Sequence, residues 1–279
     1  MKKTTEHKEP DISFEQLEEI VNLLAALYGQ DFTEYSKASL KRRVNRILMK
    51  KHFTVYELKQ EIINQPSFVD ELILEITVNV TEMFRDPAFY GAVRKKVLPY
   101  LKSFPRIKIW NAGCSTGEEV YSFAIMLDES GMYANSFLYG TDINTRVLDK
   151  ARKGIYTLHQ MKEYSENYLK TGGTASLAEF YSAAYDAAAI HQGLKKNVLF
   201  ATHNLATDSV FNEFEMIVCR NVLIYFENSL QEKVIQLFYD SLRPLGFLCL
   251  GSKETIRFTE LRKKFRVVDQ EQKIYQKIG

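Results

Sequence analysis

The sequence predicts an all-helical N-terminal domain over residues 11–80 and an α/β domain over residues 81–279 that carries a small inserted β-subdomain. Apolar residues recur at helical spacing before residue 80. After Pro105, short apolar strands alternate with helices, which is typical of a parallel, doubly wound, Rossmann-like sheet. A glycine-bearing loop separates the first of these strands from its helix, as in many proteins of this fold class.

The N-terminal domain is expected to hold helices only. Ser13 and Gln16 have the spacing of a capping box at a helix start, and Gly29 is a residue type at which helices commonly end. Pro66 separates the last two helices. The helices are expected between Ser13 and Gly29, from about Lys37 to Lys51, and over residues 54–65 and 67–79.

The α/β domain is expected to end in two short β segments that form an antiparallel edge. Residues 155–202 break the alternation and are interpreted as the insertion, with short strands of their own. Periodicity does not decide whether the alanine-rich run at residues 183–189 is helix or strand. The regular elements are expected as strands at residues 107–110, 137–141, 215–219 and 247–250, with helices at about 118–129, 145–153 and 229–242.

Composition excludes several classes of protein. The 37 lysines and arginines against 35 acids give a net charge of +2, which argues against a general nucleic-acid binder. There is no run of 18 apolar residues, so we expect no membrane span, and the lysines at the N-terminus precede no apolar segment of a signal peptide. The 3 cysteines lie far apart and the 5 histidines show no metal-ligand spacing. We therefore expect a cytoplasmic protein without a disulfide framework or a metal site.

The glycine loop has the form Gly113-x-x-x-Gly117, which differs from the dinucleotide pattern. The helix after it opens with Glu118 and Glu119, whose carboxylates would repel a pyrophosphate and suit a cationic or hydroxyl-bearing ligand. S-Adenosylmethionine, a sulfonium with a ribose and no phosphate, is such a ligand. Alternatively, the two glutamates only complement the helix dipole, and the loop alone favours neither interpretation.

Asp142 ends the second strand of the α/β domain, about 25 residues after the glycine loop. An acidic side chain at this place can accept hydrogen bonds from both hydroxyls of a ribose. Alternatively, it caps the helix that begins at Thr145.

The second expected helix is strongly basic, with seven basic residues and no acid between Ser36 and His52. Arg42, Arg46 and Lys50 follow i, i+4, i+8 spacing on one face. A solvated face is the plain interpretation, and docking of an acidic helical partner is the functional one. RNA binding is a weaker alternative, because no aromatic residues interleave on that face.

Five motifs in family order resemble the chemoreceptor methyltransferases of bacterial chemotaxis (the CheR type), which methylate receptor glutamates with S-adenosylmethionine. The resemblance runs from about residue 13 to 277. It departs from the usual family pattern at Val78, Met83, Val120, Leu245 and residues 251–254. The motifs are residues 79–86, 112–119 followed by Tyr121-Ser122, 141–143, 204–205 and 219–226.

The resemblance assigns roles to particular residues. Arg85 and Tyr225 would face the methyl-transfer centre. The basic residues Arg42, Arg43, Arg46 and Lys50 would contact the substrate, and the insertion corresponds to a subdomain that can dock a tethering peptide. The residues implied at the cofactor are Asn79, Thr81, Arg85, Ala112, Gly113, Glu119, Asp142, Asn204, Leu205, Arg220 and Asn221.

These observations predict a monomeric, S-adenosylmethionine-dependent protein-glutamate O-methyltransferase that yields S-adenosylhomocysteine. Its expected partner is the cytoplasmic helical bundle of a chemoreceptor, for sensory adaptation. The alternatives are a cofactor-binding signalling adaptor without turnover and a methyltransferase for RNA or a small molecule. An NAD-dependent oxidoreductase has the least support.

Overall fold

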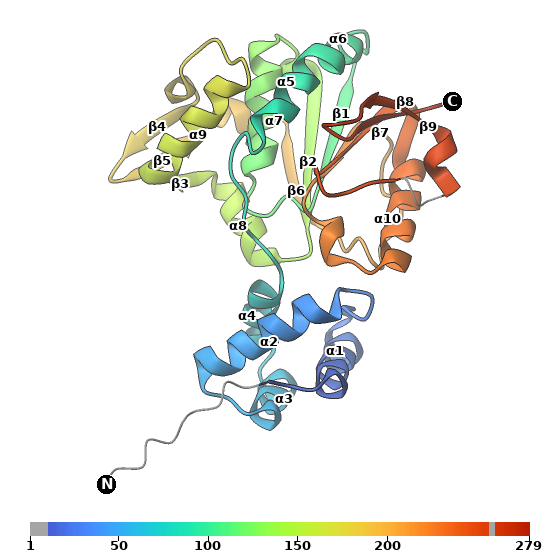
Figure 1. Ribbon diagram of the computed structural model, residues 1–279. Coiled ribbons are helices and arrows are strands. Elements are labelled where there is room, and N and C mark those ends of the chain that lie inside the picture. The colour runs from blue at the N-terminus through green and yellow to red at the C-terminus, as the bar shows by residue number, and fades with distance from the viewer. Residues whose placement is uncertain (1–10, 257–259) are drawn as a thin grey trace. The chain divides into compact units, whose positions relative to one another are not determined.

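The computed structural model describes residues 11–256 and 260–279, which form two compact units (Figure 1). One unit holds residues 11–78 together with 225–230, and the other holds residues 79–224 and 231–279. Residues 225–230 lie with the helical unit although the sequence analysis placed them in the α/β domain. The reason is local pairing: the Ser36 amide donates to the Tyr225 carbonyl at 2.8 Å, and the Phe226 ring packs edge-on against Tyr35 at 4.7 Å.

The helical unit contains the four helices that the sequence predicts. Ser13 and Gln16 form the expected capping box, and Gly29 ends the first helix in the left-handed conformation with a φ of 66°. Pro66 is the first residue of the fourth helix, where its missing N–H removes no hydrogen bond. The helices are α1 (Phe14–Tyr28), α2 (Lys37–Lys51), α3 (Val55–Asn64) and α4 (Pro66–Ile76).

A seven-stranded mixed sheet forms the centre of the α/β unit, in the order β6-β2-β1-β7-β8-β10-β9. The neighbours from β6 to β8 run parallel, and β10 and β9 add the predicted antiparallel edge. This confirms the predicted fold class. The strands are β1 (Ile107–Ala112), β2 (Ser136–Asp142), β6 (Val198–Thr202), β7 (Phe214–Cys219), β8 (Leu242–Leu250), β9 (Phe265–Asp269) and β10 (Ile274–Lys277).

Helices cover both faces of this sheet (Figure 1). Ile109 points to the face whose core includes apolar residues of α5, α7 and α8, whereas Trp110 points to the opposite face and contacts Phe238 of α10. The alternation of buried side chains along β1 therefore places helices on either side. The helices are α5 (Pro87–Lys96), α6 (Leu98–Leu101), α7 (Glu118–Glu129), α8 (Thr145–Lys153), α9 (Leu158–Lys170) and α10 (Asn228–Ser241).

The insertion folds as α9 and a small antiparallel sheet in the order β3-β5-β4. Its alanine-rich run is a hairpin, because Tyr185 and Asp186 both have positive φ angles, of 48° and 60°, as a tight primed turn requires. The strands are β3 (Ile155–Thr157), β4 (Tyr181–Ala184) and β5 (Ala187–Ile190). The predicted insertion of residues 155–202 is too long at its end, because β6 pairs with β2 in the main sheet.

Short 3₁₀ turns connect several of these elements. They cover Tyr133–Asn135, Leu177–Phe180, Gln192–Lys195, Leu223–Tyr225 and Glu260–Lys264. None of the helices in the described part of the chain is both long and apolar enough to cross a membrane.

Candidate active site

Most of the predicted cofactor residues gather at one edge of the main sheet, where the parallel strands β1, β2 and β7 end. Ligands of doubly wound sheets bind at this edge. Gly113 follows β1, Asp142 ends β2 and Arg220 follows β7. The Ser115 amide donates to Asp142 Oδ2 at 2.9 Å, so the glycine loop is tied to the end of the neighbouring strand.

The glycine loop leaves no room for a side chain at Gly113. This residue has a φ of 75°, and a Cβ on it would lie 2.5 Å from Val222 Cγ2. The amides of Gly113 and Cys114 both donate to the Thr141 carbonyl, at 2.8 and 2.9 Å. The loop is thus held between the end of β2 and the residues that follow β7.

The two glutamates that open α7 have different environments, although the sequence analysis treated them as a pair. Glu118 is buried, with 2% of its surface exposed, and accepts a hydrogen bond from Thr116 Oγ1 at 2.6 Å. Burial raises the pKa of Glu118 to about 7. The Tyr164 hydroxyl of α9 lies 3.4 Å from its other oxygen. Glu118 therefore links α7 to the insertion and has no evident role at the strand ends.

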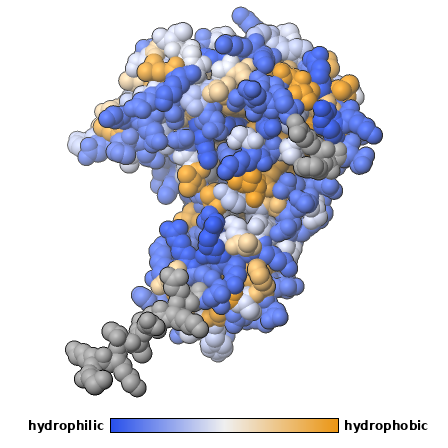
Figure 2. Space-filling model, in the orientation of Figure 1, coloured by the Kyte–Doolittle hydropathy of each residue, from blue (hydrophilic) through white to orange (hydrophobic). Residues whose placement is uncertain are grey.

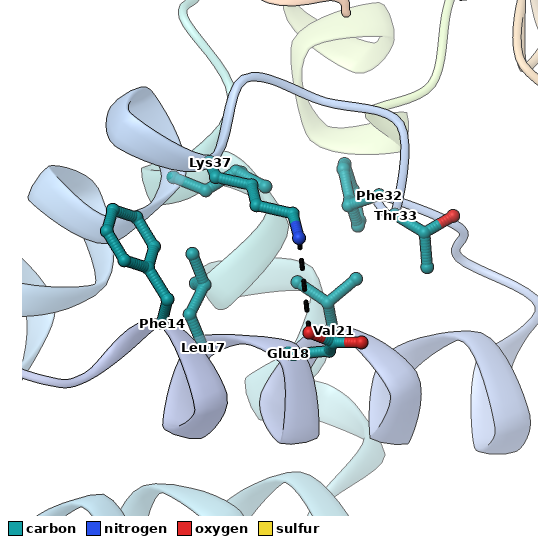
Figure 3. A pocket seen from close by; sticks show the side chains of 8 residues that line it. Phe14, Leu17, Glu18, Val21, Phe32, Thr33 and Lys37 are labelled. Carbon is teal, nitrogen blue, oxygen red and sulfur yellow. Dashed lines mark ion pairs between the residues drawn. The ribbon is translucent and has the colours of Figure 1, made fainter.

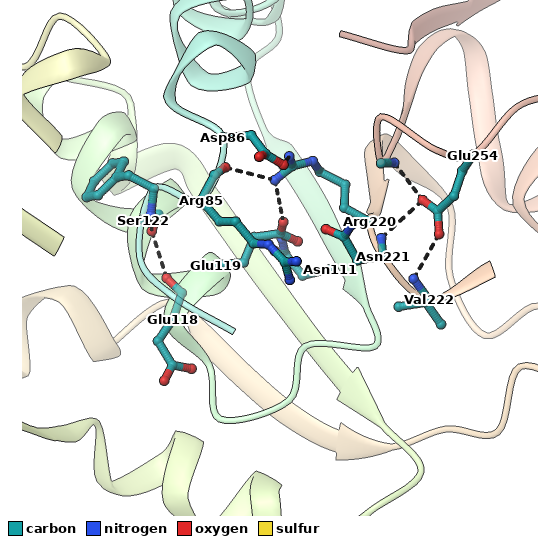
Figure 4. A network of polar contacts seen from close by, with 12 residues as sticks. Arg85, Asp86, Asn111, Glu118, Glu119, Ser122, Arg220, Asn221, Val222 and Glu254 are labelled. Atoms are coloured by element: carbon teal, nitrogen blue, oxygen red, sulfur yellow. Dashed lines mark hydrogen bonds and ion pairs between the residues drawn. The ribbon is translucent and has the colours of Figure 1, made fainter. Parts of the chain in front are cut away.

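Glu119 instead points toward the strand ends (Figure 4). Its carboxylate accepts hydrogen bonds from Asn111 Nδ2 at 3.1 Å and from Arg220 Nη1 at 3.4 Å. The Oδ1 atom of Asn111 is buried and has no partner within the described residues. An anionic group and an unused acceptor therefore lie together here, which suits a ligand with an ammonium group.

Arg220 joins three segments of the site. Its side chain is 3% exposed and lies over the Phe89 ring, 4.1 Å from the centroid. Nη2 donates to Asp86 Oδ2 at 2.6 Å, and Nη1 donates to the Arg85 carbonyl at 3.2 Å. Burial acts to lower the pKa of Arg220, but the Glu119 and Asp86 carboxylates outweigh it and raise this pKa. Arg220 is thus a buried, charged tie between β7, α5 and α7.

The first motif lies beside the glycine loop. The Asn79 carbonyl accepts a hydrogen bond from Ser115 Oγ at 3.1 Å. Arg85 is partly exposed and donates to the Val80 carbonyl at 3.3 Å, whereas the neighbouring Asp86 pairs with Arg220. Asp86 is thus engaged by the arginine that follows β7 and not by its neighbour in sequence. Of two other residues predicted for the site, Thr81 is half-buried and Ala112 is buried.

Asp142 does not cap the helix that follows it. Asn144 is the N-cap of α8, and its Oδ1 accepts from the Arg146 amide at 2.9 Å. Asp142 instead accepts from the amides of Ser115 and Asn144, each at 2.9 Å, and burial raises its pKa. Its place at the end of β2 remains compatible with ribose binding.

Asn204 and Leu205 lie in the loop after β6. The Asn204 side chain is engaged locally, because its Oδ1 accepts a hydrogen bond from the Ala206 amide at 3.0 Å. Its own amide donates to Asp208 Oδ2 at 2.8 Å. Leu205 is half-buried.

Helix α2 carries less free charge than its sequence suggests. Four of its lysines form ion pairs with acids inside the helical unit: Lys37 with Glu18, Lys41 with Asp11, Lys50 with Glu75 and Lys51 with Glu71. Arg42 and Arg46 are exposed and form no ion pair with any described residue. The face of this unit that Figure 2 shows is largely hydrophilic, with some hydrophobic residues among the hydrophilic ones.

Arg43 and Tyr225 both lie in the helical unit. Arg43 Nη1 donates to the carbonyls of Glu75 and Thr77, at 3.4 and 3.3 Å. Burial lowers the pKa of Arg43, and the nearby Tyr225 acts in the opposite direction. That Tyr225 faces the same centre as Arg85 stays a prediction.

A small cavity in the helical unit is unsuited to a nucleoside. It lies between α1 and α2, and the Lys37–Glu18 ion pair spans 3.9 Å at its side (Figure 3). Its volume is about 60 Å³, whereas sites for cofactors and other small molecules usually measure about 300–1,000 Å³. It is lined by Phe14, Leu17, Glu18, Val21, Phe32, Thr33, Lys37 and Leu40.

Sequence reasoning missed three contributors to the site. Asn111 and Ser115 have buried polar side chains. Their place beside and within the glycine loop is the signal in the sequence that could have found them. Glu254 was seen only as part of a departure from the family pattern. In the described residues, no group of three or more His, Cys, Asp or Glu side chains is placed to hold a metal ion.

The doubly wound sheet, the tight glycine loop and the carboxylates at the strand ends fit an S-adenosylmethionine-dependent methyltransferase. The chain belongs to the CheR methyltransferase family: residues 15–77 match its all-alpha domain and residues 79–274 its SAM binding domain.

Relatives of the chain span most of its length. It is 45% identical to Cher3 of Pseudomonas putida, over 98% of this chain and 99% of that one. It is 35% identical to the chemotaxis protein methyltransferase of Listeria monocytogenes, over 82% of this chain and 85% of the relative. It is 31% identical to the chemotaxis protein methyltransferase of Salmonella typhimurium, over 77% of this chain and 72% of the relative.

Proposed function

We propose that the protein transfers the methyl group of S-adenosylmethionine to glutamate side chains on the cytoplasmic helical bundle of a chemoreceptor, and that it works in the cytoplasm. The observation that carries this proposal is the site around Glu119, where Asn111 and Arg220 hold a carboxylate at the ends of β1 and β7. Two relatives that are 35% and 31% identical to the chain are chemotaxis protein methyltransferases by name.

The residues at the strand ends fit the cofactor. Glu119 and the unpartnered Oδ1 of Asn111 would accept hydrogen bonds from its ammonium group, and Asp142 from its ribose hydroxyls. Bound S-adenosylmethionine supplies a methyl group on a positively charged sulfur. The remaining contacts are proposed for Asn79, Thr81, Arg85, Ala112, Gly113, Asn204, Leu205, Arg220 and Asn221.

The substrate needs orientation more than activation. A glutamate has an ordinary pKa of about 4.3, so its carboxylate is already ionised at neutral pH and no general base is required. The enzyme must align this carboxylate and remove its water. We assign the orienting role to the guanidinium of Arg85 and the hydroxyl of Tyr225. Hydrogen bonds of moderate strength suit this role, because strong ones would make the substrate carboxylate less nucleophilic.

The helical unit is proposed to guide the receptor. The exposed guanidinium groups of Arg42 and Arg46 attract acidic helices, and electrostatic attraction of this kind speeds encounter. Arg43 lies near Tyr225 and is proposed to contact the substrate there. Lys50, which is paired with Glu75, would contribute only after that pair rearranges.

The test is incubation of the protein with methyl-labelled S-adenosylmethionine and receptor cytoplasmic domains. We expect base-labile methyl esters on glutamate with the wild type, and a strong loss with Arg85→Ala or Tyr225→Phe. Binding of S-adenosylhomocysteine without transfer to any receptor helix would contradict the proposal and favour a signalling adaptor. Transfer to RNA or to a small molecule in parallel reactions would identify a different substrate class.

A further inference from the structure

Glu254 has an unusual set of partners for a side chain at the end of a sheet. It is 4% exposed, and its carboxylate accepts hydrogen bonds from four backbone amides. Figure 4 shows those from Asn221 and Val222. Oε2 accepts from Gly251 at 2.6 Å and from Asn221 at 3.1 Å. Oε1 accepts from Val222 and from Leu223, each at 2.8 Å. Its hydrogen-bonding capacity is therefore used on backbone groups.

Three of these amides are consecutive, which requires a special backbone. Successive N–H groups converge on one anion when a residue adopts the left-handed conformation, and such concave arrangements bind anions. Asn221 has a φ of 62° and provides that conformation. The loop of residues 221–223 is thus an anion-binding turn that the chain fills with its own carboxylate.

The contact joins the ends of two neighbouring strands. Cys219 at the end of β7 pairs with Leu250 at the end of β8, and the loop and Glu254 follow directly after them. A Cβ on Gly251 would lie 2.7 Å from Glu254 Oε2 and 2.8 Å from the Asn221 amide nitrogen. The two segments therefore meet without space for a side chain at this position.

The same loop contacts the cofactor loop. Val222 fills the space above Gly113, where a Cβ would lie 2.5 Å from Val222 Cγ2. Arg220, which immediately precedes the loop, reaches Glu119 and Asp86. A shift of residues 221–223 would therefore displace both Val222, which packs against Gly113, and Arg220, which pairs with Glu119.

We propose that Glu254 is a positioning residue of the cofactor site: its carboxylate holds residues 221–223 so that Val222 and Arg220 keep their places against Gly113 and Glu119. Among the predicted cofactor residues, Glu254 binds Asn221, through its backbone amide. The inference rests on the proposed function only in taking S-adenosylhomocysteine as the ligand for the test.

The experiment compares Glu254→Gln with the wild-type full chain in calorimetric titrations with S-adenosylhomocysteine. A glutamine amide nitrogen cannot accept a hydrogen bond, so the amides on one side lose their acceptor. Hydrogen bonds to charged groups are strong enough that we expect Kd to rise about tenfold or more. In turnover assays, KM for S-adenosylmethionine should rise while kcat at saturating cofactor changes little.

Glu215→Gln is the matched control. Glu215 is also a buried carboxylate on β7, and it accepts from the Lys108 amide at 2.6 Å and from Arg243 Nη1 at 2.9 Å. Glu215 lies near the start of β7, whereas the glycine loop follows the end of β1, the strand that runs parallel to β7. We expect its substitution to lower the melting temperature while leaving Kd within about twofold of the wild type.

The outcomes separate the two proposals. Equal Kd values for Glu254→Gln and the wild type, or an equal loss in Glu215→Gln, would overturn the positioning role. If the wild type binds no S-adenosylhomocysteine, the proposed function fails instead. Hydrogen exchange then still tests Glu254: the amides of residues 221–223 should exchange faster in Glu254→Gln than in Glu215→Gln, and unchanged exchange would overturn the inference.

Discussion

Arg220 and Asp86 stand 134 positions apart in the sequence, and their side chains form a 2.6 Å ion pair that joins the end of β7 to the start of α5. The arginine side chain is almost fully buried, whereas Asp86 is about half exposed. Because Arg220 also donates to Glu119 and to the Arg85 carbonyl, one guanidinium group fixes the relative positions of three motifs.

Replacing Arg220 with Met should destabilise the protein and weaken cofactor binding together. The substitution leaves the partly buried Glu119 carboxylate without its cationic partner, and breaking a buried pair costs about 3–5 kcal/mol. Urea unfolding measures this loss, and calorimetry with S-adenosylhomocysteine measures binding. Asp86→Asn is the control, because Asp86 is more exposed and its loss should cost less. Equal stability of Arg220→Met and the wild type would contradict a structural role for the guanidinium.

Gly113→Ala should impair cofactor binding by a steric route that a second substitution relieves. Its Cβ would overlap Val222 Cγ2 and would sit on a residue with a positive φ. Backbone strain and overpacking each destabilise the folded protein by about 1–3 kcal/mol. The double variant Gly113→Ala/Val222→Ala removes the overlap but keeps the backbone strain. We expect it to recover part of the affinity for S-adenosylhomocysteine, and no recovery at all would show that the Val222 contact is unimportant.

Glu118 should make folding stability depend on pH. Burial raises its pKa from 4.5 to about 7 in the folded state. A raised pKa means that the folded state holds the proton more tightly, so this contribution is fully present below about pH 4.5 and is lost as the pH rises through about 7. The change amounts to roughly 3 kcal/mol.

Glu118→Gln isolates this contribution because glutamine is neutral and nearly the same size. The variant should lose less stability between pH 5 and pH 8 than the wild type does, measured by urea unfolding at each pH. Glu166→Gln removes an exposed carboxylate on α9 and should keep the wild-type difference. If Glu118→Gln and the wild type show the same pH dependence, Glu118 is not the group that titrates.

Local patterns predicted the elements well, and contacts between distant segments could not be predicted. Ser13 with Gln16 and Gly29 marked both ends of α1 because capping depends on neighbouring residues. Periodicity cannot identify the hairpin at Tyr185 and Asp186, since a run of alanines carries no periodic apolar signal. The edge position of β6 depends on pairing with β2, which short apolar runs do not specify.

The candidate site shows the same division. Glycines and carboxylates at strand ends follow from the chain order of a doubly wound sheet, so Gly113, Glu119 and Asp142 could be placed near one another. The role of Glu254 depends on the left-handed turn at Asn221, which lies 33 positions earlier in the chain. The lysine pairs of α2 likewise depend on acids from other elements of the helical unit.

The unpaired arginines of α2 give the last prediction. Arg42 and Arg46 are exposed, whereas Lys37 and Lys51 already have acidic partners. If acidic receptor helices dock on the arginines, Arg42→Gln/Arg46→Gln should lower kcat/KM for receptor domains by about tenfold at low salt and weaken its dependence on ionic strength. The affinity for S-adenosylhomocysteine should not change. Lys37→Gln/Lys51→Gln is the control, because it removes the same charge from the same helix. An equal loss of kcat/KM in both double variants would indicate that only the overall charge of the helix matters, and would contradict docking on the arginine face.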